Sequence, residues 1–395
     1  MEKQFVLMDV DRNVYEVDRV LNAQTTNIRS FGSEWSIRLQ RLHGGLSDGV
    51  DVVWVDNGCT RLAILPTRGM GIWKANVAGV PLEWHSPVQR PVHPTFVDQS
   101  RRGGIGWLDG FNELICRCGL GWHGAPGTDV TRDADGNVVS EQFLPLHGRI
   151  ANLPAHSVTV EISDDGAISI VGVVDEAGMF GGHLRLTAQL TTYVGSNTFE
   201  IRDTVQNLSA GSAEAEMLYH CNIGRPFVGE GAKLHIAAAE VAPRDSRAAE
   251  GISDWPTYTG PVQGYAEQVY FVRPLTADDG RALAVLAAPE GDRAVAVRFD
   301  TSTLPWFAQW KNTQAEADGY VTGLEPCSSF PNLRSFERQQ NRVVQLDPMG
   351  SVTFEFAVTV VSAADDVSRL VQEVADLQQA ERMTVHDQPN PEWSP

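Results

Sequence analysis

Residues 156–171 read His-Ser-Val-Thr-Val-Glu-Ile-Ser-Asp-Asp-Gly-Ala-Ile-Ser-Ile-Val. Apolar and polar side chains alternate over 156–162 and again over 167–171, which is the period of a strand with one buried face. Asp164, Asp165 and Gly166 separate the two runs and are typical of a tight turn. The stretch therefore predicts a β-hairpin that buries one face.

The same alternation recurs along the chain, at 184–190, 198–205, 293–299 and 351–361. Residues 306–311 form a further apolar run that is rich in aromatics, as a buried strand would be. Short strands at close spacing, separated by Gly, Asp and Pro, favour antiparallel sheets in a large sandwich or barrel. We therefore expect an all-β protein with few short helices.

Helical spacing is clear only near the C-terminus, at 364–380, where apolar residues recur on one face behind the acidic pair Asp365 and Asp366. We expect a C-terminal helix there that covers a sheet edge. No long linker and no repeat of fixed period divides the chain. We expect one domain over residues 1–385, with about 30 peripheral residues at its start, and a C-terminal tail at 386–395.

Composition narrows the functional class. The 395 residues include 50 acidic and 31 basic side chains, for a formal charge of −19, which disfavours binding to nucleic acid or to anionic membranes. The first residues lack the basic and apolar regions of a secretion signal, and no apolar run is long enough to cross a bilayer. These features predict a soluble, cytoplasmic protein.

The five cysteines are an odd number in a long chain, so we expect no disulfide framework. Cys116 and Cys118 flank Arg117 as alternating residues of a strand, which favours a pair of reduced thiols over a metal site. Five histidines could in principle bind a metal, but none has a partner at a recognisable ligand spacing. They are His85, His93, His123, His147 and His220. The sequence predicts no metal centre.

Glu325 lies in Gly-Leu-Glu-Pro at 323–326, directly after the aromatic-rich strand segment. Pro326 would hold the backbone rigid, and Trp306, Trp310 and Tyr320 could form an apolar wall that raises the pKa of the carboxyl group. Glu325 is therefore a candidate general base. The alternative is an ordinary exposed acid in a turn.

Two histidines have comparable settings. His220 alternates with Tyr219 and Cys221 along an apparent strand and shares its face with Asn222, which suits a hydrogen-bonded imidazole that gives or takes a proton. His147 precedes Arg149 by two residues, and strand alternation would let both reach one polar ligand. The alternative for His220 is a structural histidine, and the alternative for Arg149 is a surface cation.

Other side chains complete the candidate substrate-binding set. Arg68 lies in a glycine-flanked turn at 66–70, and the alternative for it is also a surface cation. The block at 107–113 combines Trp107 with Asp109, and flat aromatics beside hydrogen-bonding groups suit the apolar faces and hydroxyl rims of sugars. Lys311, at the end of the 306–311 strand, is the last member. No G-x-S-x-G motif of a serine hydrolase is present.

Taken together, several motifs resemble the galactose mutarotase (aldose 1-epimerase) superfamily and, more closely, its branch called the domain-of-unknown-function 4432 family. The resemblance covers roughly residues 30–362. It rests on Leu65-Pro-Thr-Arg-Gly-Met70, Trp84-His-Ser-Pro87, Gly106-Trp-Leu-Asp-Gly-Phe111, Leu146-His-Gly-Arg-Ile-Ala-Asn-Leu-Pro154, Leu218-Tyr-His-Cys-Asn-Ile-Gly224 and Tyr320-Val-Thr-Gly-Leu-Glu-Pro326.

The resemblance implies a β-supersandwich, two large antiparallel sheets with a sugar-binding groove. It implies that Glu325 takes a proton from the anomeric hydroxyl and that His220 protonates the ring oxygen, so that the ring opens and closes as the other anomer. His147, Arg149 and Arg68 would bind substrate. Neither a metal nor a cofactor is implied, the partner is a small carbohydrate, and a homodimer is compatible with the fold. The aspartate that gathers sugar hydroxyls in mutarotases has no match.

Two other functions remain open. The same acid and base could act at a C–H bond, as in the epimerisation of a keto-sugar. The chain could instead be a carbohydrate-binding module without catalysis. Solvent deuterium at carbon in the product would indicate the former, and sugar affinity without turnover the latter.

Overall fold

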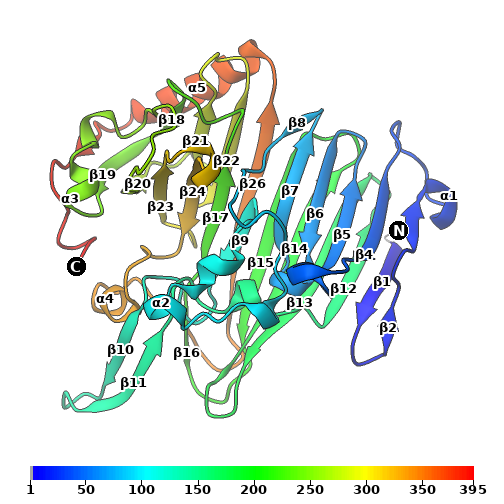
Figure 1. Cartoon of the computed structure of the whole chain (residues 1–395), viewed down its shortest axis with the longest axis horizontal. Coiled ribbons are helices and arrows are strands. Elements are labelled where there is room, and N and C mark those ends of the chain that lie inside the picture. Colours follow the sequence, from blue (N-terminus) through cyan, green and yellow to red (C-terminus); the bar gives the residue numbers. More distant parts are fainter. Residues whose placement is uncertain (1–2) are drawn as a thin grey trace.

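The structure, a computed structural model, describes residues 3–395. Within these residues the strands form two large sheets that pack face to face (Figure 1). Neighbouring strands run antiparallel, apart from one short parallel pair at an edge. The expectation of an all-β supersandwich with few short helices is confirmed.

Ten strands form the first sheet, and the predicted hairpin lies in it. Ser157–Ile162 and Ala167–Ala177 pair in register, and the turn between them has Gly166 at a φ of +92°. The strands in spatial order are β18 (Lys233–Ile236), β21 (Arg281–Ala287), β22 (Ala294–Asp300), β26 (Ser351–Val361), β15 (Thr198–Asn207), β14 (His183–Tyr193), β13 (Ala167–Ala177), β12 (Ser157–Ile162), β1 (Lys3–Asp9) and β2 (Val14–Tyr15).

Thirteen strands form the second sheet, which carries the candidate residues. The strands in spatial order are β27 (Thr384–Val385), β19 (Ala238–Pro243), β20 (Gln268–Pro274), β23 (Trp306–Asn312), β24 (Val321–Cys327), β17 (Leu218–Ile223), β9 (Ile115–Cys118), β7 (Gly71–Val77), β6 (Thr60–Leu65), β5 (Asp51–Asp56), β4 (Ser36–Arg41) and β3 (Val20–Asn22), with β8 (Val80–Pro81) paired to β7.

Two small sheets and five helices of the described chain complete the fold. The small sheets are the protruding hairpin of β10 (Gly127–Arg132) and β11 (Val138–Leu144), and the pair β16 (Ala213–Ala215) and β25 (Val344–Leu346) (Figure 1). The helices are α1 (Ala23–Thr26), α2 (Arg101–Gly104), α3 (Ser246–Ala249), α4 (Arg334–Gln339) and α5 (Ala364–Gln378).

Side-chain alternation divides strand β17 between two environments. Tyr219, Cys221 and Ile223 point into the main core between the sheets, where burial of apolar surface supplies most of the stabilisation. Leu218 and its alternating neighbours point the opposite way, into a smaller cluster with Trp107. The second face would be open to water if no other segment covered it.

A buried ion pair joins the two sheets through the main core. The guanidinium of Arg117 on β9 donates to both carboxylate oxygens of Asp203 on β15, at 2.5 and 3.0 Å, and Tyr219 adds a third hydrogen bond to that carboxylate. Removal of one partner would leave a buried charge unpaired, at a cost of roughly 3–5 kcal/mol. Arg117 therefore faces the core, while Cys116 and Cys118 face the outer cluster as free thiols.

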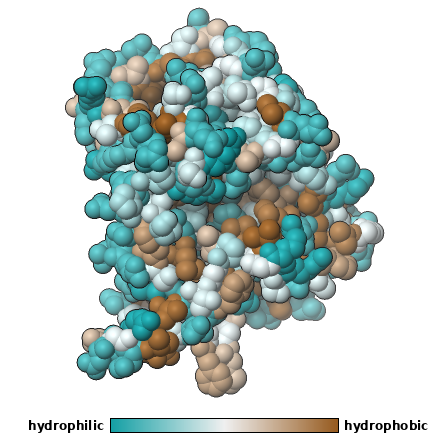
Figure 2. Space-filling model, turned by 60° about the vertical axis from the view of Figure 1, so that its left-hand side comes forward, coloured by the Kyte–Doolittle hydropathy of each residue, from teal (hydrophilic) through white to brown (hydrophobic). Residues whose placement is uncertain are grey.

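The irregular segment 84–113 lies against the outer face of the thirteen-stranded sheet. Trp84, Trp107 and Phe111 from this segment cover the middle strands. With the left-hand side of Figure 1 turned forward, the surface is hollowed between an upper and a lower part of the molecule (Figure 2). The loops therefore convert a sheet face into a partly enclosed site.

The C-terminal residues pack against the edges of both sheets. Helix α5, predicted at 364–380, begins at Ala364 and packs on β18 and β21 at the edge of the first sheet (Figure 1). Beyond it β27 pairs with β19, and Trp393 is buried against Phe330. The segment 386–395 is thus a tail that docks on the body. Among residues 3–395 no helix is both long and apolar enough to span a membrane.

Candidate active site

Strand register brings His220 and Glu325 together. Strands β17 and β24 pair Leu218 with Cys327 and Cys221 with Leu324, which places His220 opposite Glu325 on the outer face. Nε2 of His220 lies 3.2 Å from Oε1 of Glu325, and both side chains are almost fully buried. This oxygen makes no hydrogen bond within residues 3–395, so the contact is close but leaves the carboxyl group able to bond a further partner.

Asn222 sets the tautomer of His220. Its side-chain amide nitrogen donates to the backbone oxygens of Glu113 and His220, at 2.9 and 3.1 Å. The amide oxygen is therefore turned to Nδ1 of His220, 2.6 Å away, and that nitrogen must carry the hydrogen. In the neutral imidazole Nε2 is then a proton acceptor that faces the carboxyl group.

Burial shifts both groups of the pair toward their uncharged forms. Desolvation raises the pKa of Glu325 well above 4.5, and the nearby carboxylate of Glu267 raises it further. Desolvation lowers the pKa of His220 to about 3, and the neighbouring ring of His147 adds to this effect. Over a wide pH range the pair therefore holds a single proton at its facing side chains.

His147 and Trp107 lie beside the pair. The His147 ring is 5.5 Å from that of His220 and 4.7 Å from that of Trp107, between ring centroids. Nδ1 of His147 donates to the backbone oxygen of His123, and burial lowers the pKa of His147 to about 4, so its Nε2 is an acceptor at neutral pH. The buried indole N–H of Trp107 has no hydrogen-bond partner within residues 3–395.

Phe111 and Trp310 complete an aromatic enclosure around the imidazole of His220. Their ring centroids lie 5.1 and 5.2 Å from it, both in edge-to-face orientation. Sequence analysis assigned Trp310 to the apolar wall but gave Phe111 no separate role. Aromatic walls limit the access of water, which accounts for the pKa shifts of the pair.

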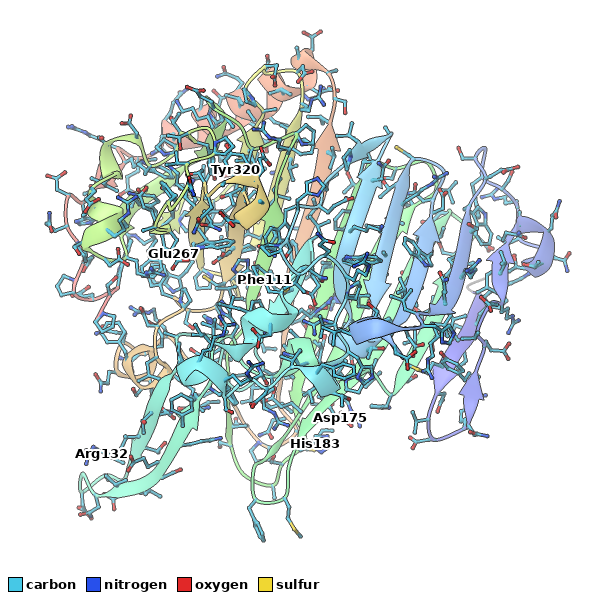
Figure 3. All side chains as sticks on the ribbon, in the orientation of Figure 1. Phe111, Arg132, Asp175, His183, Glu267 and Tyr320 are labelled. Atoms are coloured by element: carbon cyan, nitrogen blue, oxygen red, sulfur yellow. The ribbon has the colours of Figure 1, made fainter. Side chains whose placement is uncertain are left out.

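Glu267 is a rim residue that sequence analysis missed. It accepts hydrogen bonds from the indole nitrogen of Trp310 at 2.6 Å and from Arg244 at 3.1 Å, while about half of its side chain stays exposed. Figure 3 shows it with Phe111 at the part of the sheet where β17 and β24 run. An acid directly before a strand carries no motif, so only its hydrogen bond with Trp310 identifies it.

Gly323 leaves room for the carboxyl group of Glu325. A Cβ atom at this position would lie 2.2 Å from Oε1 of Glu325 and 3.2 Å from Cε1 of His220. Any larger residue would displace one of the two groups. The glycine that the sequence places two residues before Glu325 therefore has a direct steric role.

Arg68 supports the site from behind. It is buried at 1% exposure, donates to Glu113 over 2.5 Å, and also binds the oxygens of Val92, Gly110 and Asn152. The backbone oxygen of Glu113 in turn receives the amide of Asn222. Arg68 thus positions the loop that holds Asn222, and it lies too deep to contact substrate.

Arg149 and Asp109, two further candidates for substrate binding, lie away from the pair. His147 and Gly148 have φ values of +60° and +71°, so this segment is a turn, and the alternation expected to bring Arg149 beside His147 does not hold. Arg149 is exposed in a separate cavity with His183, which Figure 3 shows far from Phe111. Asp109 pairs with Arg101 and Arg102 near the surface.

Lys311 lies on the core side of its strand. It donates to the backbone oxygens of Asp254, Trp255 and Thr257, and burial lowers its pKa to about 8. The structure therefore does not bring Lys311 to the pair. Among residues 3–395, no three His, Cys, Asp or Glu side chains gather in the arrangement of a metal site.

The fold is a galactose mutarotase-like β-supersandwich. The model of the family described as "Domain of unknown function (DUF4432)" matches residues 47–360, and the chain belongs to that family. The resemblance drawn from the sequence motifs is thereby confirmed. No curated protein matches the sequence.

Solved structures agree with this assignment. A "putative aldose 1-epimerase" from Klebsiella pneumoniae is 31% identical, with 98% of this chain and 99% of that chain covered and a TM-score of 0.91. A galactose mutarotase-like protein from Clostridium acetobutylicum is 14% identical, covers 82% and 98%, and has a TM-score of 0.56. Galactose 1-epimerase from Lactobacillus acidophilus is 10% identical, covers 83% and 99%, and has a TM-score of 0.53. The last two show likeness of fold alone.

Proposed function

We propose that the protein interconverts the anomers of a sugar by acid/base ring opening, with Glu325 and His220 as the reacting pair. The observation that carries this proposal is the 3.2 Å contact between Nε2 of His220 and Oε1 of Glu325. The hydroxyl and ring oxygens of a cyclic sugar are bonded to the same carbon. An acid and a base that touch each other can therefore serve both oxygens at once.

The proton count of the pair fits this chemistry. Ring opening removes a proton from the anomeric hydroxyl and delivers one to the ring oxygen, so the pair must hold one proton before and after the step. When Glu325 is ionised and His220 protonated, Glu325 is the base and His220 the acid. The bond between the anomeric carbon and the ring oxygen breaks, the aldehyde end rotates, and reversal of the two transfers closes the ring.

Neighbouring groups suit the binding of the remaining hydroxyls. His147 offers an acceptor, the indole N–H of Trp107 offers a donor, and Glu267 offers a carboxylate at the rim. The buried Trp107 and His147 lose little on binding a polar ligand, because they have few bonds to water to give up. Phe111 and Trp310 provide apolar faces for the C–H side of the ring.

The names of the structurally similar proteins support the same chemistry, since they include "putative aldose 1-epimerase" and "galactose 1-epimerase". The test is saturation-transfer NMR of anomer exchange over a panel of aldoses, ketoses and their phosphates. We expect catalysed exchange of at least one sugar, with no solvent deuterium at carbon. Deuterium incorporation would instead assign the pair to C–H epimerisation, and affinity without exchange would indicate a binding module.

A further inference from the structure

A cavity lies beside Trp84, whose ring contacts Phe111 of the aromatic enclosure around His220. It has a volume of about 370 Å³ and is lined by Trp73, Glu83, Trp84, Asn112 and Glu316 among others; we call it the Asn112 cavity. A larger cavity of about 820 Å³ shares its Trp73 side and adjoins it. The size is within the range of small-molecule sites.

Asn112 is the unusual residue of this cavity. It is 4% exposed, and neither the oxygen nor the nitrogen of its side chain makes a hydrogen bond within residues 3–395. Oε2 of Glu83 is likewise buried without a hydrogen-bond partner in that part of the chain. Buried polar groups are rarely left unpaired, because the lost hydration is not repaid. The amide of Asn112 and the carboxylate of Glu83 are therefore both available to hydrogen-bond a ligand in this cavity.

The residues that line the cavity determine which chemical class of ligand it can bind. Among residues 3–395 no Lys or Arg lines the cavity, whereas Glu83 does, and so does Glu316, which is ion-paired with Arg225; the lining therefore disfavours phosphates and carboxylates. An ammonium could bond to Glu83 and to the oxygen of Asn112, but it has no acceptor for the Asn112 nitrogen. Hydroxyl groups both donate and accept. Trp73 and Trp84 add apolar surface that suits sugar C–H groups, although the Lys74 ammonium lies 4.3 Å from the Trp73 ring centroid and so occupies one face of that ring.

We propose that the Asn112 cavity binds a neutral polyhydroxyl ligand, a sugar ring or an alditol, at a site distinct from the reacting pair. The two sites are separated by the rings of Trp84 and Phe111, which contact each other at an angle of 49°. Trp84 lies 5.1 Å from Phe111, and Phe111 lies 5.1 Å from His220, between ring centroids. They are also joined, since the backbone oxygen of Glu113 accepts from the indole of Trp84 and from the amide of Asn222.

The test uses indole ¹⁵N–¹H NMR of the full-length chain with Glu325→Gln, which removes the proposed base so that turnover does not interfere. The probes are D-glucose, D-galactose, D-xylose and sorbitol, with choline and glucose 6-phosphate as charged comparisons. We expect the indole signals of Trp73 and Trp84, assigned by Trp→Phe variants, to shift saturably with at least one neutral probe. Trp107 and Trp310 report the other site.

Addition of Asn112→Leu should weaken that titration at least tenfold, whereas Gln372→Leu on the exposed surface of α5 should leave it unchanged. Leucine needs no hydrogen-bond partner, so the variant should fold with an equal or higher Tm. If it does not fold, Glu83→Gln takes its place with the same expected weakening. The proposal is overturned if Trp73 and Trp84 respond to no neutral probe, respond only to choline, or respond equally in the Asn112→Leu chain. Because the readout is binding without turnover, it is independent of the proposed anomer exchange.

Discussion

Nδ1 of His220 lies 2.6 Å from the side-chain oxygen of Asn222, and this bond decides which nitrogen of the imidazole faces Glu325. Asn222 cannot rotate to offer its nitrogen instead, because that nitrogen already donates to Glu113 and to the backbone of His220. A single amide therefore fixes both the orientation and the tautomer of the proposed acid.

Replacement of Asn222 should affect turnover more than substrate binding. Asn222→Leu removes the partner of Nδ1, and we expect kcat for anomer exchange to fall roughly 10- to 100-fold, within the range of one acid/base contribution. KM should change little, because Asn222 is fully buried beneath His220. A larger effect on KM than on kcat would show that Asn222 contacts the sugar.

Asn222→Asp provides a second readout at the same position. A carboxylate beside Nδ1 favours the imidazolium, so the pKa of His220 should rise from about 3. We expect the acidic limb of the rate profile to move to higher pH by at least one unit. An unchanged limb would contradict the assignment of that limb to His220.

The pH dependence of exchange should have a broad plateau across neutrality. The pair is active when it holds one proton. The rate should fall below about pH 3, where His220 takes up a second proton, and again at alkaline pH, where the raised pKa of Glu325 is passed. A rate that rises through a single pKa near 4.5 would show that Glu325 is an ordinary hydrated base.

Gly323→Ala tests the steric fit of the site. The added methyl group would meet Oε1 of Glu325 at 2.2 Å, and the carboxyl group must move away from His220. We expect a loss of roughly 100-fold in kcat, because acid/base catalysis depends on this placement. Gly211→Ala, where nothing lies within 4 Å, is the control and should have wild-type activity. Equal activity of both variants would contradict the predicted contact.

Glu216 should make stability depend on pH. It is buried at 1% exposure beside Ser329, and desolvation raises its pKa to about 8 from 4.5. Because the folded-state pKa is the higher one, the folded state binds this proton more tightly. Its stabilisation is complete below pH 4.5 and is lost as pH rises through 8, by at most ~4–5 kcal/mol.

Glu216→Gln removes that titration while it keeps the shape of the side chain. We expect urea unfolding to show a smaller loss of stability between pH 6 and pH 9 than in the wild type. Glu381→Gln, at an exposed position, should behave as the wild type does. Parallel pH dependence of the Glu216→Gln and wild-type proteins would show that Glu216 is not the group responsible.

Local sequence patterns predicted much of the fold because the strands depend on alternation. The runs at 156–162, 184–190 and 351–361 correspond to β12, β14 and β26. The same logic placed His220 and Asn222 on one face of β17. Alternation could not predict that β17 pairs with β24. The two strands are about a hundred residues apart in the chain, so no local sequence pattern indicates that they are neighbours.

The remaining site residues show where single-sequence reasoning fails. Arg149 follows a turn with two left-handed residues, and that geometry overrides the spacing that suggested a shared ligand. Lys311 follows the alternating pattern of strand β23. The sequence of a single strand does not indicate which of its two faces packs against the core, and Lys311 lies on the core face. Glu267 became visible only through its hydrogen bond with Trp310.

The most direct test is the rate of anomer exchange by the Glu325→Gln protein on the sugar that the wild type turns over fastest, with Glu381→Gln as the matched control. The amide has nearly the size of the acid but cannot take the anomeric proton. We predict a fall of at least 1,000-fold with sugar affinity retained, and wild-type rates for the control. An exchange rate within tenfold of the wild type would contradict the assignment of Glu325 as the base.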